Sequence, residues 1–321
     1  MREKGRRRAD PVLVLTGCLV AACTGAGRAA NGGSAVGRSD AGGGGVTNAA
    51  AQGNAGNASG SCSTTPKSSE ISQIASIPDY GQNDTAYGGF VSGNYCGPTA
   101  VSNSLMWLSD HGFPNLALRS DDRKKDQHDL IAALGSPSYF DTNAVFDGTP
   151  PSSLLPGLKR YLVDKGYTHR RLEWQGWSPI AVPAEFDTRI QVPELAWLKL
   201  GIERTGGVWL LLAYGRYDSA NDRCRITNGH WVTLVGHGWD GAQQDPDCLV
   251  VHDPWTGGSL THEYLRTRKL ASGQFSVEVS GLPNYTASAA GYYETRGLPW
   301  ASSYDMWLIG AIVLEMPGDC S

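Results

Sequence analysis

The sequence predicts an α+β domain in which an N-terminal helical part packs on a C-terminal antiparallel sheet. Two observations lead to this prediction. Segments with apolar residues at helical spacing lie mainly in the first part of the folded region, and segments rich in β-branched and aromatic residues lie mainly in the second. In a fold built of alternating parallel units, helices and strands would alternate along the chain. Here the predicted helices come mainly first and the predicted strands mainly later.

The predicted elements follow from periodicity and from their end signals. The first helix follows Gly97 and Pro98, because Val101, Leu105 and Leu108 then recur at helical spacing. Most of the other helices have a plausible cap or proline at the start and a glycine at the end. The predicted helices are 100–108, 121–134, 152–165 and 193–204. The predicted strands are 208–214, 230–237, 249–253, 275–279 and 308–316.

The N-terminus has the order of a bacterial export signal. Basic residues precede an apolar run, Pro11–Ala22, that is too short to span a bilayer. Cys18 and Cys23 each follow small residues, as in a lipoprotein box, and one of them is predicted to carry the lipid. The alternative is an ordinary cleavage site. We expect residues 1–23 to be a signal peptide and the protein to be periplasmic or on the cell surface, anchored as a lipoprotein.

A tether is predicted between this signal and the folded domain. Between Thr24 and Ser61 there are twelve glycines and no aromatic residue, so the segment cannot bury enough apolar surface to order itself. All ten tryptophans of the chain lie after this segment. We therefore expect a flexible tether over 24–65 and one folded domain over 66–321.

Charge and composition narrow the classes of function. The chain has 321 residues and a formal net charge of -4. Without an excess of basic residues there is no positive field to attract nucleic acid or an anionic membrane surface. We therefore exclude nucleic-acid binding and expect membrane contact only through the lipid anchor. No cofactor and no metal are expected.

Cys96 is the candidate nucleophile. It stands immediately before a predicted helix, where unpaired backbone N–H groups and the helix dipole favour a thiolate over a thiol. The alternative is a small buried cysteine that fills space at the start of the helix, because free cysteines are among the most buried residues. By itself this position does not decide between the two.

His230 and Asp253 are the candidate partners of this thiol. His230 begins a predicted strand, which holds the ring rigidly on the same face as Val232 and Leu234. Asp253 ends the next predicted strand, and antiparallel pairing brings it near the start of the His230 strand. The alternatives are a core histidine bonded to a backbone carbonyl and a turn-forming aspartate before Pro254.

The remaining cysteines are assigned by compartment, because thiols outside the cytoplasm tend to pair. If Cys18 leaves with the signal, Cys23 carries lipid and Cys96 is catalytic, four of the seven cysteines remain. The predicted pairs are Cys224 with Cys248, which flank one predicted hairpin, and Cys62 with Cys320, which join the ends of the domain. If Cys18 carries the lipid instead, one thiol is left over.

Four motifs occur in the order found in one family of enzymes. They are Ile77-Pro78-Asp79-Tyr80-Gly81-Gln82-Asn83-Asp84, Cys96-Gly97-Pro98-Thr99-Ala100, Gly229-His230-Trp231-Val232 and His252-Asp253-Pro254. In these motifs the chain resembles the double-glycine (bacteriocin-processing) peptidase-like family of papain-type cysteine peptidases. The resemblance implies a papain-like fold, Cys96 as nucleophile, His230 as general base and acid, and Asp253 as its orienting group. It also implies Gln82 as a side-chain donor to the oxyanion.

The expected function is therefore an exported, lipid-anchored cysteine peptidase or related acyl-transfer hydrolase acting on a peptide or protein. The chain lacks the transmembrane and ATPase portions of transporter-linked family members, so leader-peptide removal during export is not expected. There are two alternatives. One is a cell-wall amidase or endopeptidase acting on peptidoglycan, and the other is a catalytically inactive surface binding module on the same fold.

Overall fold

The computed structural model describes residues 77–83, 94–143, 148–256, 262–278 and 284–317. The predicted signal peptide, the whole predicted tether and Cys18, Cys23, Cys62 and Cys320 lie outside the described residues. The helices are α2 (Cys96–Asp110), α3 (Arg123–Gly135), α4 (Pro151–Asp164) and α5 (Leu195–Glu203). The strands are β1 (Arg171–Gly176), β2 (Gly206–Asp218), β3 (Arg223–Trp239), β4 (Gln244–His252), β5 (Glu263–Lys269), β6 (Gln274–Val277), β7 (Thr286–Ser288), β8 (Tyr293–Arg296) and β9 (Asp305–Glu315). Each helix and strand predicted from the sequence overlaps one of these elements.

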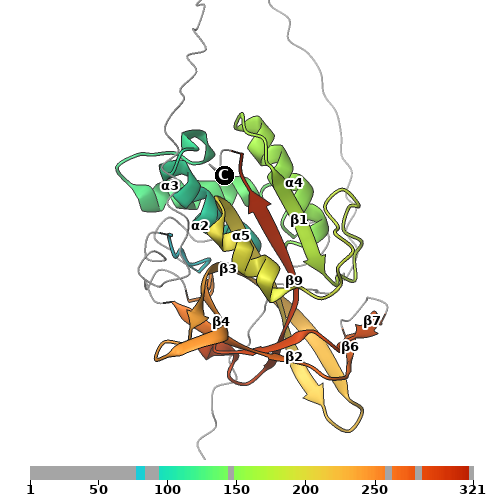
Figure 1. Ribbon diagram of the computed structural model, residues 1–321. Helices are drawn as coiled ribbons and strands as arrows, with labels where there is room; N and C mark the ends of the chain where they lie inside the picture. Colours follow the sequence, from blue (N-terminus) through green and yellow to red (C-terminus); the bar gives the residue numbers. More distant parts are fainter. Residues whose placement is uncertain (1–76, 84–93, 144–147, 257–261, 279–283, 318–321) are drawn as a thin grey trace, which may run out of the picture. The chain divides into compact units, whose positions relative to one another are not determined.

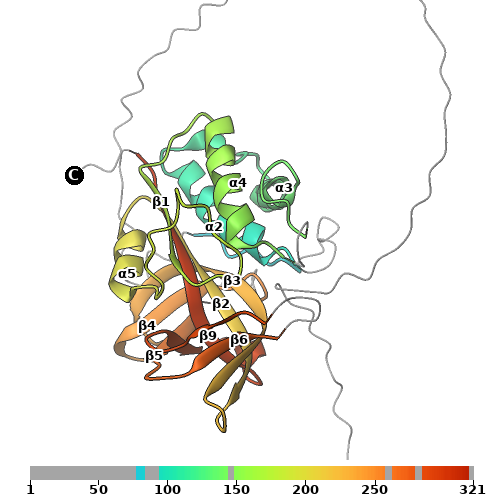
Figure 2. The ribbon, with the colours of Figure 1, turned by 90° about the vertical axis from the view of Figure 1, so that its right-hand side faces the viewer.

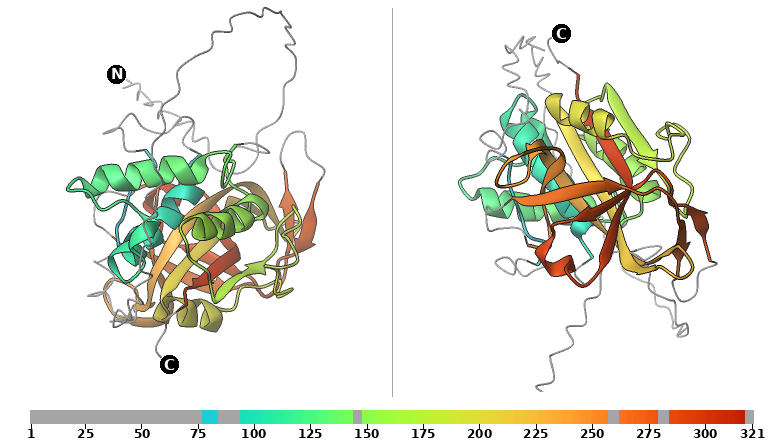
Figure 3. Two further views of the ribbon diagram at one scale, coloured as in Figure 1. Left: turned by 90° about the horizontal axis from the view of Figure 1, so that it is seen from above. Right: turned by 60° about the horizontal axis from the view of Figure 1, so that its bottom comes forward.

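The strands close into an antiparallel barrel, so the predicted papain-like fold, with a helical part packed on an antiparallel sheet, is wrong. Six strands pair in the ring β2–β3–β4–β5–β8–β9, and β9 pairs back onto β2. Figures 1 and 3 show these strands curving around a common interior. The described part is mostly sheet, with β1 added beside β9 and with β6, paired parallel to β3, and β7 at the other side.

Closure of the barrel was not predicted from the sequence, because the strands that close it carry many charges. β5 alternates buried Glu263 and Leu265 with more exposed neighbours, and its second half is largely basic. β8 is only four residues long and ends in an arginine. Neither segment is enriched in β-branched residues, which is the signal that marks a half-buried strand in a sequence. Without β5 and β8 the sheet has two open edges, and closure cannot be predicted.

Alternate residues of the central strands separate two apolar clusters. The barrel interior is lined by residues such as Leu210, Val232 and Leu234, and α5 packs Leu198 against them. The opposite face of β2 and β3 carries Trp231 and other large side chains that pack against α2 and α4. Successive side chains of a strand point to opposite faces, so one strand supports both clusters.

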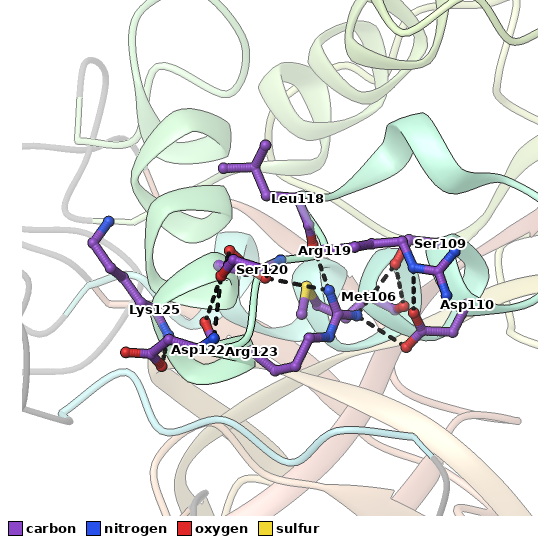
Figure 4. Close-up of polar contacts among 10 residues, drawn as sticks. Met106, Ser109, Asp110, Leu118, Arg119, Ser120, Asp122, Arg123 and Lys125 are labelled. Atoms are coloured by element: carbon purple, nitrogen blue, oxygen red, sulfur yellow. Dashed lines mark hydrogen bonds and ion pairs between the residues drawn. The ribbon is translucent and has the colours of Figure 1, made fainter.

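Helices α2, α3 and α4 lie together on one side of the barrel (Figure 2). Asp122 caps α3, because its side chain accepts a hydrogen bond from the Lys125 N–H at 3.0 Å. Arg123, in the first turn of α3, donates to Asp110 at the end of α2 at 2.9 Å and to the Leu118 carbonyl oxygen (Figure 4). These contacts fix α3 against α2. None of the described helices is both long and apolar enough to cross a membrane.

Candidate active site

Cys96 is the first residue of α2 and is fully buried. No side chain caps this helix, and the Tyr95 carbonyl accepts from the Thr99 N–H at 2.9 Å. The free N–H groups at a helix start and the helix dipole stabilise a negative charge there. The expectation that Cys96 stands at the start of a helix is therefore met, in a position that can favour a thiolate.

The start of α2 packs directly against the strand that carries His230. A Cβ atom on Gly97 would lie 3.0 Å from Thr149 Cβ and 3.3 Å from Trp231 Cδ1, so a glycine allows this close approach. The indole Nε1 of Trp231 donates to the Thr149 carbonyl oxygen at 2.8 Å. Trp231 directly follows His230 in β3, so the start of α2 contacts this strand one position along from the candidate base.

His230 and Asp253 are in direct contact, as the predicted hairpin required. His230 Nε2 lies 2.5 Å from Asp253 Oδ1, and both side chains are buried. A carboxylate only accepts hydrogen bonds, so Nε2 carries the proton of a neutral ring and Nδ1 is the nitrogen that can accept one. In this tautomer the nitrogen that faces away from the carboxylate, Nδ1, can accept a proton, as a general base must.

Asp253 receives two further hydrogen bonds, one of them from a residue that the sequence analysis missed. The Trp255 backbone N–H donates to Oδ1 at 2.8 Å, and Trp300 Nε1 donates to Oδ2 at 2.7 Å. The Trp300 ring also meets the His230 ring edge to face, with centroids 5.4 Å apart. Trp300 lies in a short 3-10 helix, Pro299–Ala301, before β9, and no pattern in the sequence links it to the distant residue Asp253.

Replacing Trp300 with phenylalanine tests this contact. The substitution keeps an aromatic ring beside His230 but leaves Oδ2 of a fully buried carboxylate without its donor. We expect the free energy of unfolding to fall by about 1–3 kcal/mol. Urea unfolding measures this change, and Trp197→Phe on the half-buried face of α5 is the matched control. Equal losses in the two variants would contradict a specific role for the indole N–H.

Gln82 lies in an irregular segment, residues 77–83, that we call the strap. The Gln82 backbone N–H donates to the Pro254 carbonyl oxygen at 2.8 Å, and the residue is almost fully buried. Pro254 directly follows Asp253, so the strap brings Gln82 to the end of β4 where the His230 partner lies. The candidate oxyanion donor and the candidate orienting acid are thus held on adjoining backbone.

Asn103 joins the strap to α2 and β3. Its Oδ1 accepts from the Tyr80 N–H at 3.2 Å and from Gln127 Nε2 of α3 at 2.6 Å. Its Nδ2 donates to Thr233 Oγ1 at 3.2 Å, and that hydroxyl donates to the Ala100 carbonyl oxygen at 2.7 Å. All these groups are buried, where a satisfied polar network fixes a single arrangement. The sequence analysis did not single out Asn103, because a buried asparagine inside a helix is recognisable only from its partners.

Two buried acids border Asp253. Burial, together with the nearby Glu263 and Asp253 carboxyl groups, raises the pKa of Asp79 to about 7. Burial also raises the pKa of Glu263 to about 7, although a hydrogen bond from Thr256 opposes the shift. Asp79 Oδ1 and Glu263 Oε2 make no hydrogen bond within the described part of the chain. The site therefore contains carboxyl groups that are partly protonated at neutral pH.

The predicted disulfide between Cys224 and Cys248 is wrong, because both residues are free thiols. β3 is longer than expected and begins at Arg223, so Cys224 lies at its start, in register with Tyr217 of β2. Cys248 precedes Leu249, which pairs with His237 near the other end of β3. A disulfide requires Cα atoms within about 7 Å, which these strand positions do not provide. The other predicted pair, Cys62 with Cys320, lies outside the described residues.

Comparisons with models of protein families, with curated proteins and with solved structures found no match to this chain. Among the described residues, no group of three or more His, Cys, Asp or Glu side chains is arranged to hold a metal ion.

Proposed function

We propose that this protein is an exported cysteine hydrolase that transfers an acyl group from a peptide or amide to water. The observation that supports it best is the contact between His230 Nε2 and Asp253 Oδ1, at 2.5 Å, on the strand against which the helix that begins with Cys96 packs. A helix-start thiol, an imidazole oriented by a carboxylate and that buried carboxylate are the parts of a nucleophilic triad.

The proposed reaction begins with removal of the Cys96 proton by His230 Nδ1. Sγ then attacks the substrate carbonyl carbon, and the carbonyl oxygen becomes an oxyanion. The Gln82 side-chain amide and the Cys96 backbone N–H are the proposed hydrogen-bond donors to this oxyanion. When the C–N bond breaks, the leaving amine takes the proton from His230 and a thioester remains on Cys96.

Water completes the cycle. His230 removes a proton from a water molecule, whose oxygen attacks the thioester carbonyl. The C–S bond then breaks, a carboxylic acid is released and the proton returns to the Cys96 thiolate. The Asp253 carboxyl group accepts from His230 Nε2 and stabilises the imidazolium form of His230.

Selective alkylation tests the proposal, and the other buried cysteines serve as internal controls. Burial raises the pKa of the Cys224 thiol to about 12 and that of the Cys248 thiol to about 11. Neither has an appreciable thiolate fraction near neutral pH, whereas an activated Cys96 does. We expect iodoacetamide to label Cys96 at pH 6–7 at least about a hundredfold faster than either control. Peptide mass spectrometry of the full chain measures the three rates.

The dependence on His230 makes the test decisive. In the His230→Ala variant, labelling of Cys96 at pH 6–7 is expected to fall to the rate of Cys224. If Cys96 in the unmodified chain reacts no faster than Cys224 and Cys248, the hydrolase proposal fails and Cys96 is a structural cysteine.

The membrane anchor is part of the same proposal and has a separate test. We propose that Cys23, or alternatively Cys18, carries the lipid after export. Incorporation of labelled palmitate by bacterial cells expressing the full chain is expected to be lost in only one of the variants Cys23→Ser and Cys18→Ser. No labelled product from the unmodified chain would contradict the anchor without bearing on the hydrolase.

A further inference from the structure

His252 connects the end of β4 to the strap. Its Nδ1 lies 3.1 Å from the Pro78 carbonyl oxygen, and its Nε2 lies 2.8 Å from Nδ1 of His262. The two rings are nearly parallel, with an angle of 9° between their planes, and His252 is almost fully buried. The next two residues after His252 are Asp253, which contacts His230, and Pro254, which accepts from Gln82.

The partners define the protonation of both rings. A carbonyl oxygen only accepts, so His252 Nδ1 carries a proton and donates it to Pro78. In a neutral ring Nε2 is then an acceptor, and His262 Nδ1 is the donor to it. Burial, together with the nearby His262, lowers the pKa of His252 to about 4, so the ring is neutral at pH 7. Both hydrogen bonds therefore exist together under ordinary conditions.

We propose that His252, supported by His262, is a positioning residue that holds the strap so that the Gln82 side chain faces the substrate oxyanion. This inference rests on the proposed function, because it assigns the role of a residue in that reaction. His252 acts on the N-terminal part of the strap through Pro78, while the Pro254 carbonyl holds the Gln82 backbone. The three consecutive residues His252-Asp253-Pro254 thereby position both the oxyanion donor and the base.

Of the charged and titratable groups near His252, one bonds to its ring and others interact with different residues. His262 is the only one bonded to His252 among the described residues. Asp79, on the strap beside Pro78, interacts with the Glu263 and Asp253 carboxyl groups. Since the His252 ring is neutral at pH 7, its effect on the strap comes from the hydrogen bond to Pro78 and not from charge.

Two probes separate positioning of the oxyanion donor from activation of the thiol. Alkylation by iodoacetamide replaces iodide at a saturated carbon, so no oxyanion forms and only the thiolate matters. Acylation by p-nitrophenyl acetate passes through a tetrahedral oxyanion and releases nitrophenolate, so it depends on both. Loss of one oxyanion donor typically lowers the rate by about a hundredfold or more, and this is the effect expected for Gln82→Ala on acylation only.

We expect His252→Phe in the full chain to lower the acylation rate by at least about tenfold while alkylation of Cys96 stays within about twofold. His252→Asn keeps an amide donor near the position of Nδ1 and is expected to retain most of the acylation rate. His262→Phe, which leaves the Pro78 contact in place, is expected to give a smaller loss. His237→Phe, on β3 beside Glu203, is the matched control and is expected to leave both rates unchanged.

Each outcome decides between the alternatives. If His252→Phe lowers alkylation as much as acylation, or lowers neither, His252 does not position the oxyanion donor. Equal losses in His252→Phe and His252→Asn would also overturn the inference. If His252→Phe does not fold, His262→Phe must still lower acylation more than alkylation, and equal changes of the two rates in that variant would overturn the inference. Failure of Cys96 to react with either probe in the unmodified chain would overturn the proposed function itself.

Discussion

Replacing Asp253 with asparagine is expected to lower acylation of Cys96 by p-nitrophenyl acetate by about 10²–10⁴-fold. The Asp253 carboxylate accepts from His230 Nε2, the Trp255 N–H and Trp300 Nε1. An asparagine side chain has one accepting oxygen and one donating NH₂, so at least one of these donors would meet another donor. Either His230 changes tautomer or a buried N–H loses its acceptor.

The same substitution is expected to lower the free energy of unfolding by about 1–3 kcal/mol, the cost of one buried polar group without a partner. Asp129→Asn is the matched control, because Asp129 forms an exposed ion pair with Lys125. Acylation kinetics and urea unfolding of both variants measure the two effects. An Asp253→Asn variant that keeps the acylation rate within a few-fold would remove Asp253 from the proposed triad.

Replacing Asp79 with asparagine is expected to stabilise the protein at alkaline pH. The folded protein holds the pKa of Asp79 at about 7, above the 3.8 of an ordinary aspartate, through burial and the neighbouring Glu263 and Asp253. The folded state therefore binds more protons than the unfolded state between these two values. The stability contributed by the protonated form is present at low pH and is lost as pH rises through about 7. At pH 8 the wild-type chain holds an ionised, buried Asp79.

We expect the Asp79→Asn variant to gain stability over the wild type by about 2–3 kcal/mol more at pH 8 than at pH 5. Urea unfolding at both pH values measures this difference. Comparing the two chains at each pH cancels the contribution of His252, whose lowered pKa gives the opposite slope between about pH 4 and 6.5. Asp129→Asn is expected to show no such change. A pH-independent difference between Asp79→Asn and wild type would show that Asp79 is ionised at pH 5 in the folded state.

The candidate site was more accessible to sequence reasoning than the fold was. Cys96 at a helix start, His230 on a strand and Asp253 on the next strand are all local features, and a hairpin suffices to bring the last two together. Trp300, Asn103 and His262 were missed, because each acts through a partner far away in the sequence. Trp300, for example, bonds to Asp253 from a short helix 47 residues later in the chain.

The sequence by itself determined the local elements, because helix caps, apolar spacing and β-branched runs act over only a few residues. It also determined that Asp253 would lie beside His230, because two consecutive antiparallel strands leave little freedom. Closure of the barrel was decided only in the tertiary structure, where charged strands such as β5 and β8 are held by pairing on both sides. The separation of Cys224 from Cys248 was decided there as well, because the register of a long strand depends on all of its neighbours. Hydrogen bonds and packing between residues distant in the chain decide these features, and no short segment of the sequence contains them.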